Sequence, residues 1–165
     1  MLKEYEIVPA GPDKADDVMR ITQTVIKSVY PRYYPAGAVQ FFSDHHSTER
    51  VAEDIAAGLV YILKTEGHPV GTVTVKGCCI NRLFVLPEYQ RRGFGRALLD
   101  LAENIISKNY PAAEMDVSLP AKSIYLKRGY KETEYHTVET QNGDFLCYDV
   151  MVKTFSAAPA QDVIS

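Results

Sequence analysis

The apolar positions of the chain follow two different periods. Within residues 13–30 and 96–108, apolar side chains recur at helical spacing, whereas residues 60–75 and 145–153 carry short runs of β-branched and aromatic residues. Recurrence at every third or fourth position indicates an amphipathic helix, and a short β-branched run bounded by turn residues indicates a strand. The chain is therefore predicted to combine several helices with several strands.

Prolines, glycines and capping residues place the boundaries of these elements. Acidic residues begin the first helix, Pro31 and Pro35 end it, and Gly129 ends the last one. We predict helices over 13–30, 36–57 with an interruption at 44–47, 96–108 and 121–128. We predict strands over 7–10, 60–64, 70–75, 79–85, 115–118, 130–137 and 145–153, the last two joined by a turn at 141–144.

Length and charge exclude several classes of protein. The 165 residues hold no repeat or linker-like stretch, which predicts one domain over 1–155 and a flexible C-terminal tail over 156–165. A formal net charge of −3 does not favour nucleic-acid binding. No apolar run reaches the roughly 18 residues of a membrane span, and the first residues are charged. We expect a cytoplasmic protein with no nucleic-acid or membrane partner.

The cysteines and histidines do not indicate a metal site. Cys78 and Cys79 are neighbours whose side chains point to opposite faces of a strand, and no Cys-x-x-Cys spacing occurs. His45 and His46 diverge on a helix and have no evident third ligand. We therefore expect reduced thiols and no bound metal. For Cys79, an acetyl-carrying nucleophile is the alternative to a small buried side chain.

The segment from 83 to 99 carries the most specific chemistry. A strand leads into Gln90-Arg91-Arg92-Gly93-Phe94-Gly95 and a helix follows, so free main-chain N–H groups and the positive end of the helix dipole meet at one point. Such a point binds an anion, and glycine at 93 and 95 leaves room for a phosphate.

The charges around this turn agree with a phosphate ligand. Arg82, Arg91, Arg92 and Arg96 outnumber Glu88, which makes the segment positive within a negative chain. A dinucleotide fingerprint and a P-loop are both absent, because the third glycine or alanine of the former and the Gly-Lys-Ser/Thr of the latter do not occur. The ligand is therefore expected to be another kind of phosphate compound.

Two motifs resemble those of the GNAT superfamily of acetyl-coenzyme A-dependent N-acetyltransferases. Residues 90–95 match its Gln/Arg-x-x-Gly-x-Gly/Ala signature, and residues 121–130 match its Ala-x-x-x-Tyr-x-x-x-Gly-Phe/Tyr helix. The family often has asparagine where this chain has Ser118. The resemblance implies an α/β (α+β) fold, with a mixed, mostly antiparallel central sheet of about six to seven strands, flanked by helices and splayed after the fourth strand.

The same resemblance implies a site for acetyl-coenzyme A in the splayed sheet. The pantetheine arm is expected beside the strand at 83–85, where an N–H near Val85 would polarise the acetyl carbonyl, and the diphosphate is expected on the turn at 91–96. The residues expected to contact the cofactor are Leu83, Phe84, Val85, Gln90, Arg91, Arg92, Gly93, Phe94, Gly95, Arg96, Ser118 and Lys122.

Tyr125 lies at the family's general-acid position and is the predicted catalytic residue. A phenol with a pKa of about 10 stays protonated near neutral pH and donates its proton readily as a thiol with a pKa of about 8.5 leaves. The base is left open. Many relatives have glutamate near the position of Asn81, which cannot accept a proton, so the candidates are His45, His46, Glu49, Asp116 through water, or no dedicated base.

The aromatic loop at 30–35 predicts one wall of an acceptor site, since tyrosines between prolines are seldom needed for packing alone, and packing into the core is the alternative for this aromatic cluster. The residues expected to contact the acceptor are Tyr30, Tyr33, Tyr34, His45, His46 and Asn81. The predicted function is transfer of acetyl to a primary amine by direct attack in a ternary complex, with a small-molecule acceptor and a monomeric or homodimeric enzyme. The alternatives are a peptide N-terminus or lysine as acceptor, or a non-catalytic acyl-coenzyme A sensor.

Overall fold

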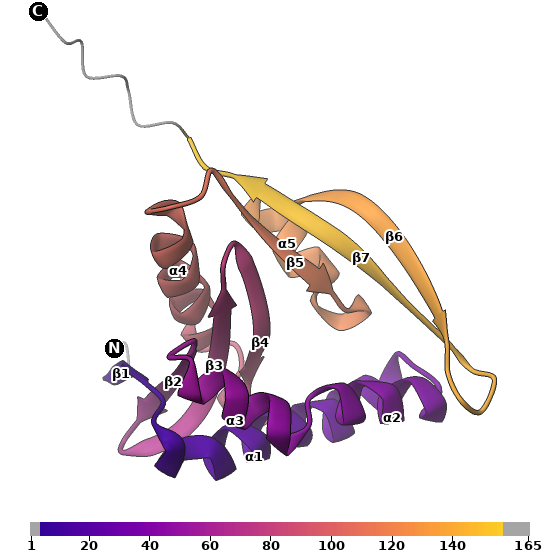
Figure 1. The fold of residues 1–165 in the computed structure, drawn as a ribbon, viewed down its shortest axis with the longest axis horizontal. Helices are drawn as coiled ribbons and strands as arrows, with labels where there is room; N and C mark the ends of the chain where they lie inside the picture. The colour runs from indigo at the N-terminus through magenta and orange to yellow at the C-terminus, as the bar shows by residue number, and fades with distance from the viewer. Residues whose placement is uncertain (1–3, 157–165) are drawn as a thin grey trace, which may run out of the picture.

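The computed structural model describes residues 4–156, and its seven strands form one sheet in the order β1-β2-β3-β4-β5-β7-β6 (Figure 1). Every neighbouring pair is antiparallel except β4 and β5. The strands are β1 Tyr5–Pro9, β2 Val60–Thr65, β3 His68–Lys76, β4 Cys79–Val85, β5 Ala112–Val117, β6 Lys131–Glu139 and β7 Phe145–Thr154. The predicted mixed, mostly antiparallel sheet is confirmed, and the predicted tail lies outside the described residues apart from Ser156.

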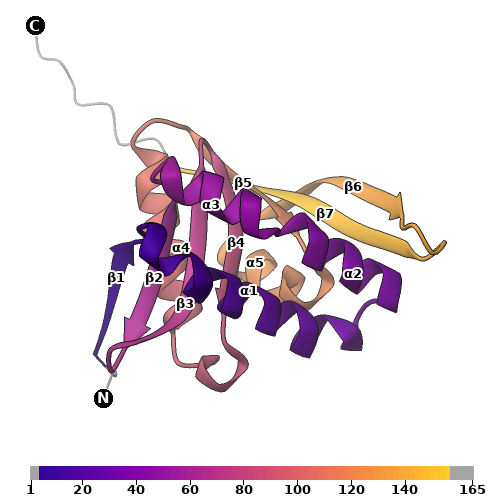
Figure 2. The same cartoon turned by 60° about the horizontal axis from the view of Figure 1, so that its bottom comes forward.

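Helices cover both faces of the sheet (Figure 2). The α-helices are α1 Ala15–Val29, α2 Ala36–His45, α3 Thr48–Ala56, α4 Phe94–Ser107 and α5 Lys122–Arg128. Helix α1 lies against β3 and β4 on one face, and α4 lies against the same strands and β5 on the other. Within residues 4–156, no helix has the length and apolar character needed to cross a membrane.

The core forms because each helix turns one apolar stripe to the sheet. Val18, Ile21 and Ile26 of α1 are completely buried. Leu98 of α4 is also completely buried, and Ile106 is almost so. The helical spacing read from the sequence therefore identified the buried faces correctly. The predicted break in the second helical region is also confirmed, because α2 ends at His45 and the Ser47 hydroxyl caps α3 by accepting a hydrogen bond from the Arg50 main-chain N–H.

Several boundaries differ from the prediction. Helix α4 begins at Phe94 rather than at 96, because Gly93 adopts a left-handed conformation and serves as its N-cap. Strand β5 begins at Ala112 rather than at 115, since its partner β7 extends to Thr154 and pairs with Ala112. In both cases the boundary depends on backbone geometry or on a distant partner strand, neither of which local residue preferences report.

Strands β4 and β5 pair over a single register position. Cys79 faces Glu114, the Glu114 N–H donates to the Cys78 carbonyl at 2.9 Å, and no further pair joins the two strands among the described residues. Beyond that point they diverge, as Figure 1 shows. The predicted splay after the fourth strand is therefore present, and the rest of β4 has no strand on its β5 side.

The β6–β7 hairpin bridges this divergence by reaching back to α2 (Figure 1). The Gly37 N–H, in the first turn of α2, donates to Asp144 Oδ2 at 2.8 Å in the hairpin turn. A Cβ at residue 37 would lie 1.9 Å from Asn142 Oδ1 and 2.6 Å from Thr140 Oγ1. Only glycine fits between the helix and the turn, so this close approach latches the hairpin to α2.

Replacing Gly37 with alanine is expected to push the hairpin turn away from α2. Overpacking of this kind costs roughly 1–3 kcal/mol, so denaturant unfolding should show a loss of stability in that range. The double variant Gly37→Ala/Asn142→Ala, which removes the nearest clashing side chain, should lose less than the sum of the two single changes. Strict additivity in this cycle would contradict the proposed contact.

Candidate acetyl-transfer site

The turn between β4 and α4 presents a row of unbonded main-chain N–H groups. Within the part of the chain that the structure describes, no protein acceptor bonds to the N–H of any residue from 91 to 96, and the first intrahelical bond of α4 runs from Ala97 N–H to the Gly93 carbonyl. Arg91 and Gly93 both have left-handed φ values, of 62° and 85°. Alternating left-handed residues of this kind curl successive N–H groups around an anion, and the helix dipole adds to the attraction.

The glycines of this turn leave space in front of those groups. A Cβ added at Gly93 would meet no atom within 4 Å, and one added at Gly95 would meet only Val85 Cγ2 at 4.0 Å. The space is therefore open rather than filled by protein. A diphosphate fits the donors present, since they are several, unpaired and adjacent to open space.

The arginines divide into two groups. Arg91 and Arg96 are exposed at the turn, and Arg92, also exposed, donates to the Glu88 carbonyl at 2.9 Å with its guanidinium 5.2 Å from the Tyr89 ring centre. Arg82 does not belong with them, although the sequence analysis counted it there. Its side chain is only 6% exposed and pairs with Asp54 at 2.6 Å, so its charge is neutralised inside the protein.

Gln90 does not face the turn opening. Its Nε2 donates to the Val85 carbonyl at 3.0 Å and thereby closes the end of β4. Phe94 is buried and packs against Tyr5 of β1 with 5.8 Å between ring centres. Phe94 thus supports the turn from the core and Gln90 is held by the end of β4, which leaves the main chain of the turn with Arg91 and Arg96 to meet a ligand.

The β4 segment expected to hold the pantetheine arm lies next to the predicted catalytic tyrosine. Phe84 packs 6.4 Å from Tyr30, whose hydroxyl donates to Ser118 Oγ at 3.3 Å just beyond β5. Tyr125 of α5 is close enough to Tyr30 for the two phenols to influence each other electrostatically. The structure thus brings Phe84, Ser118, Tyr30 and Tyr125 together from four separate elements.

Tyr125 is almost completely buried in the core. The side chain is 7% exposed, and its hydroxyl has no hydrogen bond to any described residue. Among described residues only Thr22 Oγ1 is both fully enclosed and unbonded, so the Tyr125 proton is committed to no acceptor within the described protein. Burial, followed by the nearby Tyr30 phenol, raises the pKa of Tyr125, and its proton is therefore held throughout the physiological range.

Two ion-pair clusters hold the short helix that carries Tyr125. Arg128 donates to Glu103 of α4 through Nε at 3.0 Å and through Nη2 at 2.6 Å, and the Tyr130 hydroxyl donates to the same carboxylate at 2.9 Å. At the other end, Lys122 pairs with Glu132 and Asp149 at 3.0 Å each. This pairing occupies the Lys122 ammonium and counts against its predicted contact with a phosphate.

The sequence analysis missed Glu103 and Arg128. A signal was available, because Glu103 interrupts the apolar stripe of α4 and is only 9% exposed. A charged residue in a buried stripe requires a partner of opposite charge. Sequence alone does not say which of the many basic residues supplies it.

Neither histidine is available as a general base. Arg82 Nε donates to His46 Nδ1 at 3.2 Å, and Arg50 Nη1 lies 3.0 Å from His45 Nδ1. Because a guanidinium only donates, both Nδ1 atoms must be acceptors and both protons sit on Nε2. Burial, then Arg82, lowers the pKa of His46 to about 3, and burial, then Arg50, lowers that of His45. Of the base candidates, Glu49 and Asp116 remain, both exposed, together with the absence of a dedicated base.

The aromatic loop is more deeply buried than a pocket wall requires. Tyr34 is 6% exposed; its hydroxyl donates to the Cys147 carbonyl at 3.4 Å and accepts from the Leu119 N–H at 2.7 Å. Tyr30 belongs to the same core, whereas Tyr33 is half exposed. Tyr30 and Tyr34 thus tie the end of α1 to the segment after β5 and to β7, which agrees with the packing alternative for this aromatic cluster.

Asn81 and Cys79 share the α2 side of β4. Both are partly exposed, and Cys79 lies near Glu114 and Asp116 of β5. Burial, then Cys78, raises the pKa of Cys79 to about 11, which keeps the thiol protonated and unreactive near neutral pH. This favours the small structural side chain over the acetyl-carrying nucleophile. Among described residues no group of three or more His, Cys, Asp or Glu is arranged to hold a metal ion.

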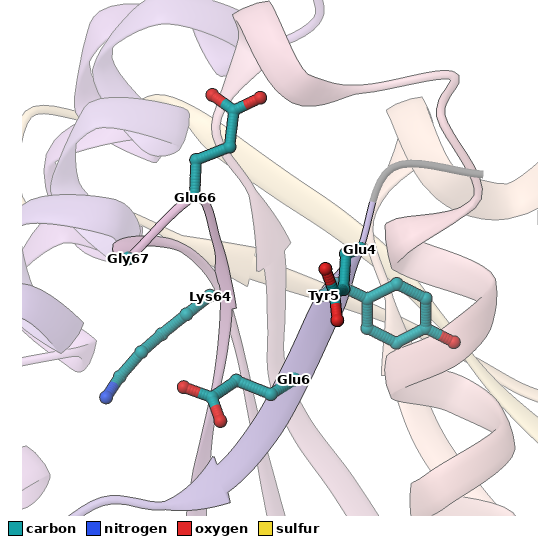
Figure 3. Close-up of a pocket in the computed structure, with 6 residues that line it drawn as sticks. All are labelled: Glu4, Tyr5, Glu6, Lys64, Glu66 and Gly67. Atoms are coloured by element: carbon teal, nitrogen blue, oxygen red, sulfur yellow. The ribbon is translucent and has the colours of Figure 1, made fainter. Parts of the chain in front are cut away.

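A separate hollow of about 520 Å³ lies at the N-terminal edge of the sheet (Figure 3). It is lined by Glu4, Tyr5, Glu6, Lys64, Glu66 and Gly67. None of these residues belongs to the predicted site, and Tyr5 turns toward α4, away from Lys64 (Figure 3). The hollow is wide open and mainly acidic, and we assign it no function.

Comparison with known proteins finds similarity to one protein family. A family profile described as an acetyltransferase (GNAT) domain matches residues 29–151. A protein of Sulfurisphaera tokodaii named N-alpha-acetyltransferase is 27% identical over 143 residues, which cover 80% of this chain and 83% of that protein.

Solved structures give the same result for the fold. A crystal structure from Rhodopseudomonas palustris, described as a GCN5-related N-acetyltransferase and as an aminotransferase of class II, is 25% identical with a TM-score of 0.84, covering 94% of this chain and 99% of that one. The PaiA N-acetyltransferase of Thermoplasma acidophilum, solved in complex with coenzyme A, is 20% identical with a TM-score of 0.72, covering 92% and 99%. The latter supports the fold alone.

Proposed function

The chain belongs to the GNAT acetyltransferase family and is an acyltransferase that uses acetyl-coenzyme A, and from that premise we propose that it acetylates a primary amine of a small molecule by direct attack in a ternary complex. Acetyl-coenzyme A supplies the acetyl group as a thioester. The observation that carries the proposal is the row of unbonded N–H groups at residues 91–96, in open space at the start of α4 and following the unpaired end of β4.

The chain's own residues divide the work of the reaction. The main chain at 91–96, with Arg91 and Arg96, binds the diphosphate, and the segment 83–85 lies along the pantetheine arm. Main-chain N–H groups near Val85 polarise the acetyl carbonyl. Tyr125 Oη holds the proton that the departing sulfur takes up, and its raised pKa keeps that proton in place beforehand.

The incoming amine must arrive neutral, and neither histidine takes its proton. An alkylammonium ion has a pKa of about 10.4, so near neutral pH only a small fraction is unprotonated. With His45 and His46 both carrying Nε2–H, the proton passes to solvent or to Asp116 through water. Asp116 lies near His45 and Cys79, on the acceptor side of β4.

The latch between α2 and the β6–β7 hairpin supports a small acceptor. The Gly37–Asp144 bond and the two Tyr34 hydroxyl contacts join residues 30–46 to the far half of the sheet. Residues 30–46 and the hairpin are thereby held together on the acceptor side of the site. A bounded site suits a compact amine better than an extended peptide.

A second acceptor class has one observation in its favour. The Sulfurisphaera tokodaii relative is named N-alpha-acetyltransferase. The α-amine of a peptide is therefore the alternative acceptor for this chain.

An acceptor panel distinguishes these proposals. Release of free coenzyme A should be measured with amines, amino acids, polyamines, aminoglycosides and peptides with free or blocked N-termini. Turnover with a small amine and none with any peptide is the expected result. Turnover limited to peptides with a free N-terminus would replace the small-molecule proposal, and no turnover with a bound cofactor would favour the sensor.

Tyr125→Phe removes the proposed proton donor without altering the buried ring. We expect kcat to fall about tenfold or more while the Kd for coenzyme A stays unchanged. Tyr110→Phe, at an exposed tyrosine beyond the end of α4, serves as the control. Because the Tyr125 pKa is raised, wild-type kcat should not decline from loss of this proton up to pH 9. An unchanged kcat in Tyr125→Phe would remove the residue from the mechanism.

Gly93→Ala tests the diphosphate contact. The added Cβ strains a left-handed residue and projects into the open space, so calorimetry should show coenzyme A binding weakened about tenfold or more. Gly58→Ala is the matched control, since Gly58 has a similar φ of 74° and equally open surroundings. It should lose comparable stability and keep wild-type affinity. Equal affinity of the two variants would contradict the assignment.

A further inference from the structure

Strand β4 contains a bulge immediately before the segment assigned to the pantetheine arm. Thr72 pairs with Phe84 and Thr74 pairs with Asn81, so β4 contains one more residue than β3 between these two pairs. Arg82 sits in this bulge with φ of 46°, in the left-handed region that a residue other than glycine seldom adopts. Such a conformation persists only where surrounding contacts impose it.

The contacts that impose it come from three other segments. The Arg82 guanidinium donates from Nη2 to Asp54 Oδ2 of α3 at 2.6 Å, from Nη1 to Thr74 Oγ1 of β3 at 3.1 Å, and from Nε to His46 Nδ1 after α2 at 3.2 Å. The Arg82 side chain is 6% exposed and that of Asp54 is 13% exposed. Since each donor points to a different partner, the guanidinium has one orientation, and the backbone that carries it is fixed as well.

This arrangement has a consequence for Leu83–Val85. If Arg82 relaxed to an extended conformation, the register of β4 would slip by one residue, and every side chain and N–H group after it would exchange direction. The His46 ring, held at Nδ1 by Arg82, also packs edge-on at 5.9 Å against Phe84. Arg82 therefore acts on this segment through the backbone and through His46.

We propose that Arg82 and Asp54 are positioning residues for acetyl transfer, because their buried ion pair holds the β4 bulge that aims the main-chain N–H near Val85 at the acetyl carbonyl. The proposal rests on the proposed function for its kinetic consequence. It does not rest on it for the structural one, since the bulge and its contacts are features of the fold itself. Neither residue touches the reacting atoms.

Asp54→Asn tests the ion pair at nearly constant volume. We expect kcat to fall about fivefold or more, while the Kd for coenzyme A rises less than in Gly93→Ala, because the pantetheine segment shifts but the diphosphate donors at 91–96 are separate from the bulge. Lys76→Gln is the matched control: Lys76 pairs with the same carboxylate at 3.7 Å but is 67% exposed, so its loss should leave kcat unchanged.

A spectroscopic readout separates positioning from general stability. In the protein without coenzyme, amide ¹H–¹⁵N shifts should move at residues 82–85 in Asp54→Asn and stay in place in Lys76→Gln. The His46 ring nitrogens report the same change. His46 faces Arg82, Arg50 and His45, and the wild-type ring should stay neutral from pH 5 to 8, with the proton on Nε2.

Three outcomes overturn the proposal. They are an unchanged kcat in folded Asp54→Asn, a fall in kcat with the amide shifts of 82–85 unmoved, and a parallel loss of kcat and coenzyme affinity, which would indicate general damage. Should Asp54→Asn fail to fold, Thr74→Val tests the same proposal. It removes one hydrogen-bond acceptor of the Arg82 guanidinium without leaving a charge unpaired, and it should lower kcat about twofold to threefold. If the wild type transfers no acetyl group, the proposed function fails. The amide shifts still test whether the Arg82–Asp54 ion pair holds the β4 bulge.

Discussion

The divergence of β4 from β5 is the constraint on which the rest of the structure depends. The two strands share only the Cys79–Glu114 pair, so most of the β5 side of β4 lacks the hydrogen-bonding partner that a sheet normally provides. Unpaired strand edges are costly and prone to wrong pairing, and a protein keeps one only where something else occupies or protects it. Here the edge runs directly into the turn whose N–H groups are also unpaired. Both sets of free groups lie in one continuous stretch, which suits a long ligand with a phosphate at one end.

Keeping the two halves of the sheet apart yet rigid requires ties elsewhere. The Gly37–Asp144 latch and the Tyr30 and Tyr34 hydroxyls join the first helices to β5 and β7, and Arg128–Glu103 joins α5 to α4. These polar ties add fixed directions to the apolar core that the two halves share. A buried ion pair is expensive to break once formed, since the remaining charge is stranded, commonly at about 3–5 kcal/mol. They therefore fix the distance between the helix that carries Tyr125 and the strand that it must serve.

The same contacts decide the chemistry of the titratable groups. Arg50 and Arg82 contact Nδ1 of His45 and His46, so each ring is neutral and carries its proton on Nε2. Both histidines can therefore donate a hydrogen bond but are not free to act as bases. Burial keeps Tyr125 protonated, and no described residue accepts a hydrogen bond from its hydroxyl. The site is consequently well supplied with proton donors and poor in bases. This agrees with a reaction in which the leaving group needs a proton and the amine loses its own to water.

The sequence by itself determined the elements, their order and the chemistry of the turn. Helical spacing identified the buried faces of α1 and α4, and the two motifs identified the family and predicted the anion-binding turn and Tyr125, because these depend on residues close together in the chain. It did not determine the roles of Arg82, Lys122 or the histidines. Arg82 was counted with the phosphate-binding charges, yet Asp54, 28 positions earlier, neutralises it. These roles depend on partners that only the packing of distant segments supplies. Such partners decide whether a charge is free or paired, whether a histidine acts as a base or as a hydrogen-bond donor, and whether a tyrosine lines a pocket or packs in the core.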